Sequence, residues 1–222
     1  MIVKVCGMRE GGNISDVIAA GADWIGMIFW PKSPRYVQMV PSLTGTMPDK
    51  PQDCSTFDTV KAKRVGVFVN DSAQNIITRV VNYKLDLVQL HGDESPTFIR
   101  NLRSTIISDI NPNVRFIKAV SIENADDTNR CAAYEGLVDY FLFDTKCKER
   151  GGCGQHFDWS ALENYQGNTP FLLSGGIGPG DAEDIKGLNL PSMIGVDINS
   201  RFETEPGVKD IGKVREFISK LR

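Results

Sequence analysis

A thiol and an ammonium group lie close together near the start of the chain. Cys6 ends a short apolar run, residues 2–6, and Lys4 stands two positions before it. If this run is a strand, the two side chains share one face and lie roughly 6–7 Å apart. A positive charge at that distance favours the thiolate, which can act as a base or a nucleophile. The alternative is a buried cysteine with a purely structural role.

A carboxyl group ends a second apolar run in the other half of the chain. Asp144 directly follows Phe141, Leu142 and Phe143. A carboxyl group at the end of a buried strand is a candidate general acid. The alternative is an aspartate whose carboxylate caps the next turn.

Cationic and imidazole side chains offer contacts to an anionic substrate. Arg35 lies in the segment 29–36, which two prolines stiffen. Its planar guanidinium can bind a carboxylate or a phosphate through two hydrogen bonds. Lys32 is a weaker candidate in the same segment, and His91 follows the apolar run 87–90. The alternatives are a solvated surface arginine and a histidine that hydrogen-bonds only to its neighbours.

A pair of glycines and a polar segment follow the last two apolar runs. Gly175 and Gly176 come directly after residues 171–174, ahead of an expected helix. Bare backbone N–H groups at such a position attract an anion such as phosphate. The alternative is a tight turn that caps the helix. We expect the substrate contacts to include both glycines and, from the segment after the final run, Asp197, Asn199, Ser200 and Arg201.

The segment 147–156 contains Cys147, Cys153 and His156, three side chains of the types that bind metals. It has no C-x-x-C pair and no second histidine nearby, so a zinc site is not expected. We expect neither a metal nor a cofactor. The glycines of this segment predict a mobile lid instead.

All of these groups stand at the ends of short runs that are apolar throughout, as in strands buried on both faces of a parallel sheet. Eight parallel strands close a (β/α)₈ barrel, whose active sites lie at the C-terminal ends of the strands. We therefore expect an α/β fold, a single TIM barrel with parallel strands over residues 1–222. A doubly wound open sheet is the alternative, but no G-x-G-x-x-G follows the first run. The expected strands are 2–6, 24–29, 64–69, 87–90, 116–120, 140–144, 171–174 and 194–197.

Helical patterns separate the runs. Ser72 is an expected N-cap, Pro96 stands at a plausible first helical position, and Gly21 ends the first helix. The segment 41–57, with three prolines, predicts a broken helix and a loose loop. The expected helices are 13–20, 72–82, 95–102, 124–134, 179–186 and 209–221, with a short candidate after Trp159.

Composition bounds the class of protein. The chain has 222 residues, of which 41% are hydrophobic and 24% charged, as in ordinary globular proteins. A net charge of −3 indicates no nucleic-acid or membrane partner. No run approaches the ~18–20 apolar residues that cross a bilayer. The five cysteines, an odd number, argue against a disulfide scaffold and predict a cytoplasmic location.

The order of these segments resembles the phosphoribosylanthranilate isomerase family over almost the whole chain. No single segment is decisive, but the order is highly specific. In the first half the resemblance rests on KVCGM (4–8), GADWIGMIF (21–29), SPRY (33–36), VGVFVN (65–70), VQLHGD (88–93) and FIKAV (116–120). In the second half it rests on FDTK (143–146), GGCGQHFDW (151–159), LSGGI (173–177), VDINS (196–200), Glu203 and PGVKD (206–210).

The resemblance implies an Amadori rearrangement of N-(5-phosphoribosyl)anthranilate to 1-(2-carboxyphenylamino)-1-deoxyribulose 5-phosphate, in tryptophan biosynthesis. It implies that Asp144 is the general acid that opens the sugar ring and that Cys6 is the base that removes the C2 proton. Such a pair suits two successive proton transfers. Arg35 would hold the anthranilate carboxylate. The phosphate would be held, largely through backbone N–H groups, by Gly175, Gly176, Asn199 and Ser200.

Two positions depart from the family pattern. Arg201 and Phe202 stand where the family commonly has Gly-Val. A glycine there can take a positive φ, which costs an arginine energy, so Arg201 is expected to cover the phosphate with its guanidinium. Cys153 stands where Ser or Thr is usual, which adds an oxidisable thiol without an implied catalytic role.

Other functions stay open at this point. Indole-glycerol-phosphate synthase would use a lysine, and Lys118 lies short of the expected strand end. Ribulose-phosphate epimerase needs a metal site of several histidines, and this chain has two. A catalytically inactive phosphate-binding barrel is a third possibility, against which the presence of Cys6 and Asp144 counts. The substrate is expected to be a small molecule and the chain a monomer, with a homodimer as the alternative.

Overall fold

The computed structural model describes residues 1–38, 62–145 and 159–222 of the chain. The loose loop expected at 41–57 and the glycine-rich segment 147–156 lie outside the described residues, and the roles predicted for them stay predictions. In the described part, no helix has the length and apolar character that would be needed to span a bilayer.

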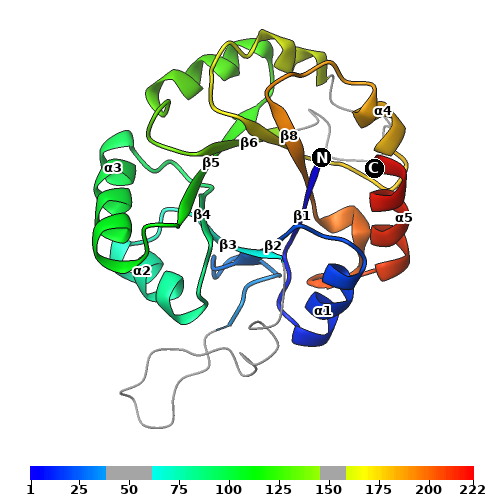
Figure 1. Cartoon of the computed structure of the whole chain (residues 1–222), viewed down its shortest axis with the longest axis horizontal. Coiled ribbons are helices and arrows are strands. Elements are labelled where there is room, and N and C mark those ends of the chain that lie inside the picture. Colours follow the sequence, from blue (N-terminus) through cyan, green and yellow to red (C-terminus); the bar gives the residue numbers. More distant parts are fainter. Residues whose placement is uncertain (39–61, 146–158) are drawn as a thin grey trace.

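Eight parallel strands close into a barrel in the order of the sequence (Figure 1). The sheet is closed because β1 pairs with both β2 and β8. This confirms the expected α/β fold, a TIM barrel with parallel strands, and excludes the open doubly wound sheet. The strands are β1 (Ile2–Cys6), β2 (Trp24–Ile28), β3 (Lys63–Phe68), β4 (Leu87–Leu90), β5 (Arg115–Ile122), β6 (Tyr140–Thr145), β7 (Phe171–Ser174) and β8 (Met193–Ile198).

The barrel interior is apolar at one end and polar at the other. Side chains alternate along each strand between the interior and the surrounding helices. An apolar interior cluster forms a floor near the N-terminal ends of the strands; it includes Trp24, Val65, Leu87, Ile117, Leu142 and Leu172. Two residues after Leu87, Leu142 and Leu172, on the same faces, stand Gln89, Asp144 and Ser174. The C-terminal ends of the strands therefore form a polar mouth above a dry floor.

The helices pack their apolar faces on the outside of the barrel. They begin where the sequence supplies caps: Ser72 accepts from the N–H of Asn75, and Ser95 accepts from the N–H of Phe98. Gly21 follows the first helix with φ of 109°. The α-helices are α1 (Gly11–Ala19), α2 (Ala73–Asn82), α3 (Pro96–Thr105), α4 (Ala182–Lys186) and α5 (Ile211–Leu221), and α3 continues as a π-helical turn, η2 (Ile106–Ile110).

Two of the expected helices differ in the structure. The segment 124–134 forms a 3₁₀ helix, η3 (Ala125–Ala133), which begins with a capping box in which the Asp127 carboxylate accepts from the N–H groups of Glu123 and Asn124. The expected helix 179–186 begins only at Ala182, after a turn in which Asp181 accepts from the N–H of Gly178.

The segment after β8 forms a 3₁₀ turn, η5 (Ser200–Phe202), and then a hairpin, β9 (Glu203–Glu205) with β10 (Val208–Lys209). The short candidate after Trp159 is a 3₁₀ helix, η4 (Trp159–Asn164).

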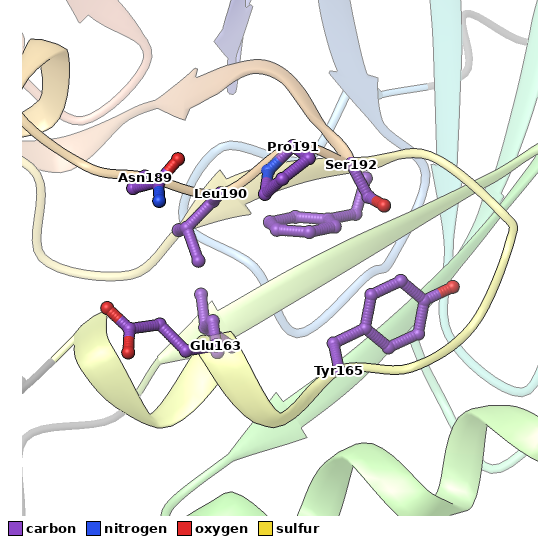
Figure 2. Close-up of a pocket in the computed structure, with 8 residues that line it drawn as sticks. Glu163, Tyr165, Asn189, Leu190, Pro191 and Ser192 are labelled. Atoms are coloured by element: carbon purple, nitrogen blue, oxygen red, sulfur yellow. The ribbon is translucent and has the colours of Figure 1, made fainter.

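A pocket of about 290 Å³ lies beside the first residue of β7. Figure 2 shows Glu163 and Tyr165 on one side and the segment Asn189 to Ser192 on the other. Because Phe171 begins β7 and Ser192 precedes β8, this pocket is at the opposite end of the strands from Cys6 and Asp144. It is therefore separate from the polar mouth.

Candidate active site

A buried ion pair forms the base of the polar mouth. Lys4 in β1 and Asp197 in β8 are paired in register, and the Lys4 Nζ lies 2.9 Å from the Asp197 Oδ1. Lys4 is fully buried and Asp197 is 6% exposed. Burial alone lowers the pKa of Lys4, but the Asp197 carboxylate and the Cys6 thiol more than compensate and raise it overall. Asp197, expected as a substrate contact, is thus engaged below the mouth by Lys4.

Cys6 stands two residues beyond Lys4, on the same face of β1, and is 4% exposed. Gly26 in β2 makes room for it, because a Cβ at Gly26 would lie 2.9 Å from the Cys6 Sγ. Burial raises the pKa of the Cys6 thiol, and the Asp197 carboxylate raises it further, although Lys4 and Lys209 oppose both effects. Lys4 favours the thiolate, as expected, but desolvation outweighs the neighbouring ammonium, so the pKa of the Cys6 thiol is raised overall.

Asp144 lies in β6 level with Ser174 of β7, and its side chain is partly exposed. Because all strands are parallel, the ends of β1 and β6 meet at one end of the barrel. Asp197 is coupled electrostatically to both sides of the mouth. Its charge raises the pKa of Cys6, while Asp144 raises and His91 lowers the pKa of Asp197. The thiol and the carboxyl group therefore face one mouth.

His91 points into this mouth from the end of β4. Its Nε2 lies 3.5 Å from the Asp144 Oδ2, and its Nδ1 lies 2.8 Å from the Gln89 Nε2. His91 therefore faces the candidate site rather than hydrogen-bonding only to its own loop. On this side the mouth opens into a pocket of about 600 Å³ that reaches Arg130 and Tyr134.

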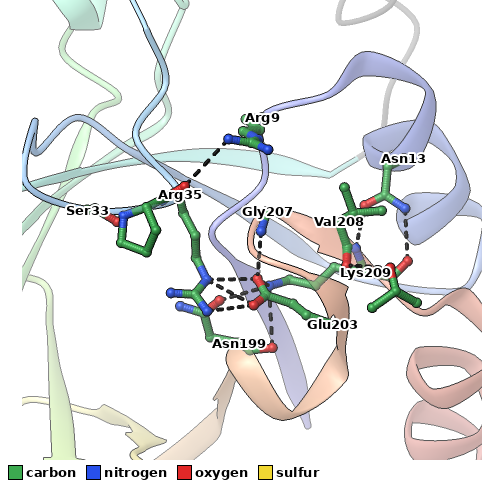
Figure 3. A network of polar contacts seen from close by, with 11 residues as sticks. Arg9, Asn13, Ser33, Arg35, Asn199, Glu203, Gly207, Val208 and Lys209 are labelled. Atoms are coloured by element: carbon green, nitrogen blue, oxygen red, sulfur yellow. Dashed lines mark hydrogen bonds and ion pairs between the residues drawn. The ribbon is translucent and has the colours of Figure 1, made fainter.

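Arg35 does not stand free (Figure 3). Its Nε and Nη2 donate to the Glu203 carboxylate, with the Nη2 to Oε2 distance at 2.6 Å. Gly7, at φ of 78°, allows this placement, because a Cβ there would lie 2.6 Å from the Arg35 Cδ. The charge of Cys6 contributes to the raised pKa of Arg35, so the guanidinium and the thiol are close enough to interact.

Lys209 completes this network from β10. It is 2% exposed, and its Nζ donates to the Glu203 Oε1 at 2.6 Å and to the Asn199 Oδ1 at 2.8 Å. Burial alone would raise the pKa of Glu203, but hydrogen bonds from Arg35 and Lys209 lower it from 4.5 to about 2. The Oδ1 of the Asn199 side chain is therefore engaged by Lys209 (Figure 3), which leaves the contact expected through the Asn199 backbone N–H a prediction.

The glycine pair after β7 has a backbone that favours glycine. Gly175 and Gly176 adopt φ of 95° and 66°. A helix was expected directly after this pair, but α4 begins only at Ala182. Any anion held here would meet the backbone of a turn rather than a helix N-terminus.

Arg201 extends toward this glycine turn from the neighbouring loop. Its Nη2 lies 3.9 Å from the position of a Cβ at Gly176, and its Cδ lies 3.2 Å from one at Gly178. Arg201 lies within η5 and has no positive φ, so the anticipated backbone strain is absent. Ser200 is exposed at the start of the same turn.

Four residues that the sequence reasoning did not assign to a role belong to this site: Gln89, Gly26, Glu203 and Lys209. The Pro206–Gly207 pair between charged residues was a signal for the hairpin that joins Glu203 to Lys209. Gln89 and Gly26 gave no local signal, because their partners are fixed only when the barrel closes.

The chain is similar to known proteins over nearly its whole length. A family model described as N-(5'-phosphoribosyl)anthranilate (PRA) isomerase matches residues 3–220. The chain belongs to this family. The N-(5'-phosphoribosyl)anthranilate isomerase of Parabacteroides distasonis is 45% identical to it, with 100% of this chain and 93% of the relative covered. That of Phocaeicola vulgatus is 42% identical, with 100% and 98% covered.

A solved structure of phosphoribosyl anthranilate isomerase superposes with a TM-score of 0.74 at 28% identity, covering 100% of this chain and 98% of that one. That protein is in complex with reduced 1-(o-carboxyphenylamino)-1-deoxyribulose 5-phosphate. The isomerase family therefore shares with this chain both the sequence and the barrel.

Gly26→Ala is expected to reduce isomerase turnover. The added methyl group would lie 2.9 Å from the Cys6 Sγ and must displace it. We expect kcat to fall on the order of 100-fold, because small misplacements of a reacting group have effects of that size. Gly12→Ala in α1 is the matched control, since a Cβ there meets nothing within 4 Å. Normal turnover in a folded Gly26→Ala protein would show that the sulfur position does not matter.

Glu203→Gln is expected to reduce stability in a pH-dependent way. The pKa of Glu203 is lowered to about 2, so its ionised form stabilises the fold above pH 4.5, and this contribution is lost as the pH falls from 4.5 toward 2. At neutral pH the variant should lose about 1.5–3 kcal/mol of unfolding free energy, the scale of hydrogen bonds to charged groups.

Urea denaturation between pH 7 and pH 2 measures this difference, which should shrink on acidification. Glu216→Gln is the control, because the Glu216 side chain is 62% exposed and its ion pair with Lys220 is exposed as well. A difference for Glu203→Gln that stayed constant over this pH range would contradict the assignment.

Proposed function

We propose that this chain converts N-(5'-phosphoribosyl)anthranilate into 1-(2-carboxyphenylamino)-1-deoxyribulose 5-phosphate by general acid–base catalysis, as the isomerase of tryptophan biosynthesis. Membership of the family over residues 3–220 supports the reaction. The observation that carries the mechanism is that the Cys6 thiol and the Asp144 carboxyl group face the same barrel mouth, with Asp197 coupled to both.

The first step opens the sugar ring. Protonated Asp144 gives its proton to the ring oxygen while the C1–O bond breaks, and the nitrogen lone pair forms an iminium at C1. The resulting Asp144 carboxylate is stabilised by the N–H of His91, whose Nε2 lies 3.5 Å from it. This distance is long, as is common in the absence of substrate.

The second step moves the proton from C2. The Cys6 thiolate removes it, the C–H electrons form a C1=C2 double bond, and the iminium electrons return to nitrogen. The Asp144 carboxylate then takes the hydroxyl proton of the enolamine and the Cys6 thiol gives its proton to C1, which yields the ketone and restores both groups. Because burial raises the pKa of the Cys6 thiol, its thiolate is a strong base. Lys4 and Lys209 provide the positive charge that stabilises the thiolate when it forms.

Two groups hold the ends of the substrate. Glu203 engages Nε and Nη2 of Arg35 and fixes the guanidinium plane, so the remaining Nη1 edge is the one that binds the anthranilate carboxylate. The phosphate binds to the backbone N–H groups of Gly175 and Gly176. The next loop contributes Ser200 and the guanidinium of Arg201, with Asn199 acting through its backbone because Lys209 occupies its side chain.

The contacts of Lys118 favour this reaction over that of a synthase. The Lys118 Nζ donates to the carbonyls of Leu90 and Gly92 and lies 3.4 Å from Glu94, so its ammonium is already engaged by neighbouring oxygen atoms. We also infer a monomer in the cytoplasm. The free thiols of Cys6 and Cys131 support a reducing compartment.

Cys6→Ala and Asp144→Ala are each expected to lower kcat at least ~100-fold with little change in substrate affinity, because each removes one proton-transfer group. The assay follows the loss of anthranilate-type fluorescence under saturating substrate. Cys131→Ala is the control, since this free cysteine is buried in the hydrophobic core and has no role in the proposed mechanism. Wild-type turnover in either variant would falsify the role given to that residue.

Arg35→Ala is expected mainly to raise KM, by roughly 10- to 100-fold, the scale of a lost hydrogen bond between charged groups. Steady-state kinetics separates KM from kcat. Arg115→Ala is the control, because Arg115 begins β5 at the far end of the barrel and its side chain is 48% exposed. A fall in kcat at unchanged KM would mean that Arg35 does not bind the substrate carboxylate.

A further inference from the structure

Gln89 is a polar residue in an unusual place. It lies in β4 inside the barrel, between Leu87 of the apolar floor and His91 of the mouth, and it is fully buried. Its Nε2 lies 2.8 Å from the His91 Nδ1. Its Oε1 is buried and has no hydrogen-bond partner among the described residues. An unpartnered buried carbonyl destabilises a fold, so packing alone does not explain a glutamine at this position.

The opposite nitrogen of the ring faces the proposed general acid. The His91 Nε2 lies 3.5 Å from the Asp144 Oδ2. Gln89, His91 and Asp144 thus form a line from the barrel interior to the mouth, and they connect β4 with β6. These two strands are not neighbours in the sheet, since β5 lies between them.

A neutral imidazole carries one N–H, so its two neighbours decide which nitrogen bears the proton. An amide N–H that donates to Nδ1 requires that nitrogen to be bare. The proton then sits on Nε2 and points at the Asp144 carboxyl group. One oxygen of Asp144 accepts from His91, and the other is left to carry the proton that goes to the substrate.

The opposite amide orientation would have the reverse effect. It would present the Gln89 Oε1 to an N–H on Nδ1 and leave Nε2 bare. Protonated Asp144 would then donate to Nε2 of His91 instead of to the sugar. A doubly protonated ring would place an N–H against each neighbour and would hold Asp144 in its ionised form, without a proton to give.

We propose that Gln89 is a positioning residue that holds His91 in the Nε2–H tautomer, so that His91 donates to Asp144 while Asp144 donates to the substrate. This inference rests on the proposed function for its catalytic consequence, but the tautomer itself is independent of it. Gln89 touches neither substrate nor reacting atoms, and it acts through His91.

The tautomer can be measured directly by ring ¹⁵N NMR, because the chain has only two histidines. Protein labelled with ¹⁵N-histidine gives two imidazole spin systems, and His156→Asn assigns them. The expected spectrum has the chemical shift of an unprotonated nitrogen for Nδ1 of His91 and that of a protonated nitrogen for Nε2. An N–H shift at Nδ1 with a bare Nε2 would overturn the proposal without any activity assay.

Gln89→Met tests the consequence for catalysis. Methionine keeps the length of the side chain and removes the amide together with its unpartnered carbonyl, so the melting temperature should stay or rise. We expect a mixture of His91 tautomers and a fall in kcat of roughly 10- to 100-fold at nearly constant KM, the scale on which outer partners of functional histidines act. Unchanged tautomer and kcat in this variant would contradict the inference.

Gln89→Glu and Leu87→Met complete the set. The carboxylate in Gln89→Glu accepts a hydrogen bond, so Nδ1 should become protonated and kcat should fall further than in Gln89→Met. If Gln89→Met does not fold, this variant carries the test. Leu87→Met, on the same face of β4, should leave the tautomer and kcat unchanged. An Nε2–H tautomer in a wild-type protein without isomerase activity would refute the proposed function but not the placement of Gln89.

Discussion

The ion pair between Lys4 and Asp197 joins the first and last strands of the barrel at the level where the apolar floor meets the polar mouth. Removing two charges from water costs several kcal/mol for each, and deleting one partner of such a pair typically costs about 3–5 kcal/mol. The pair is therefore a poor source of stability but a strong constraint on structure. It fixes the closing register of β1 against β8, and it sets the charges that act on Cys6, since Lys4 lowers the pKa of the thiol while Asp197 raises it.

A second group of charges adjoins the first. Lys4 pairs with Asp197, and Arg35 and Lys209 share Glu203, so these five groups beside Cys6 carry one positive charge in excess. With Cys6 protonated, this cluster keeps the excess positive charge, which favours an anionic substrate. With Cys6 ionised, the cluster is neutral. The surroundings of Cys6 thus combine a desolvated thiol, which makes a strong base, with charges arranged for the thiolate and for a carboxylate.

The sequence was sufficient for the barrel, but only for part of the site. Strands buried on both faces are continuous apolar runs, and β1, β4 and β7 accordingly have the bounds that the runs predict. The 3₁₀ form of the helix after β5 and the β9–β10 hairpin are not visible in the hydrophobic periodicity. Parallel strands must bring the ends of β1 and β6 to one rim, so the placement of Cys6 and Asp144 at the same rim was predictable. The pairing of Arg35 with Glu203 joins residues far apart in sequence, and the desolvation that outweighs Lys4 at Cys6 arises only in the packed barrel.

The buried polar residues of the barrel interior have a common explanation. A barrel filled only with side chains like those of Trp24, Leu87 and Leu142 would be more stable than one that buries Lys4, Asp197 and Gln89, because each of the latter loses contact with water. Residues that destabilise the fold are expected at the positions where function requires them. Lys4 and Gln89 lie one layer above the floor, at the level of Asp144, and directly beneath Cys6 and His91, which follow them on the same strand faces. A dry floor excludes water from below, so the hydrogen bonds in the layer above it act in a medium of low polarity, where the direction of a single N–H has the greatest effect.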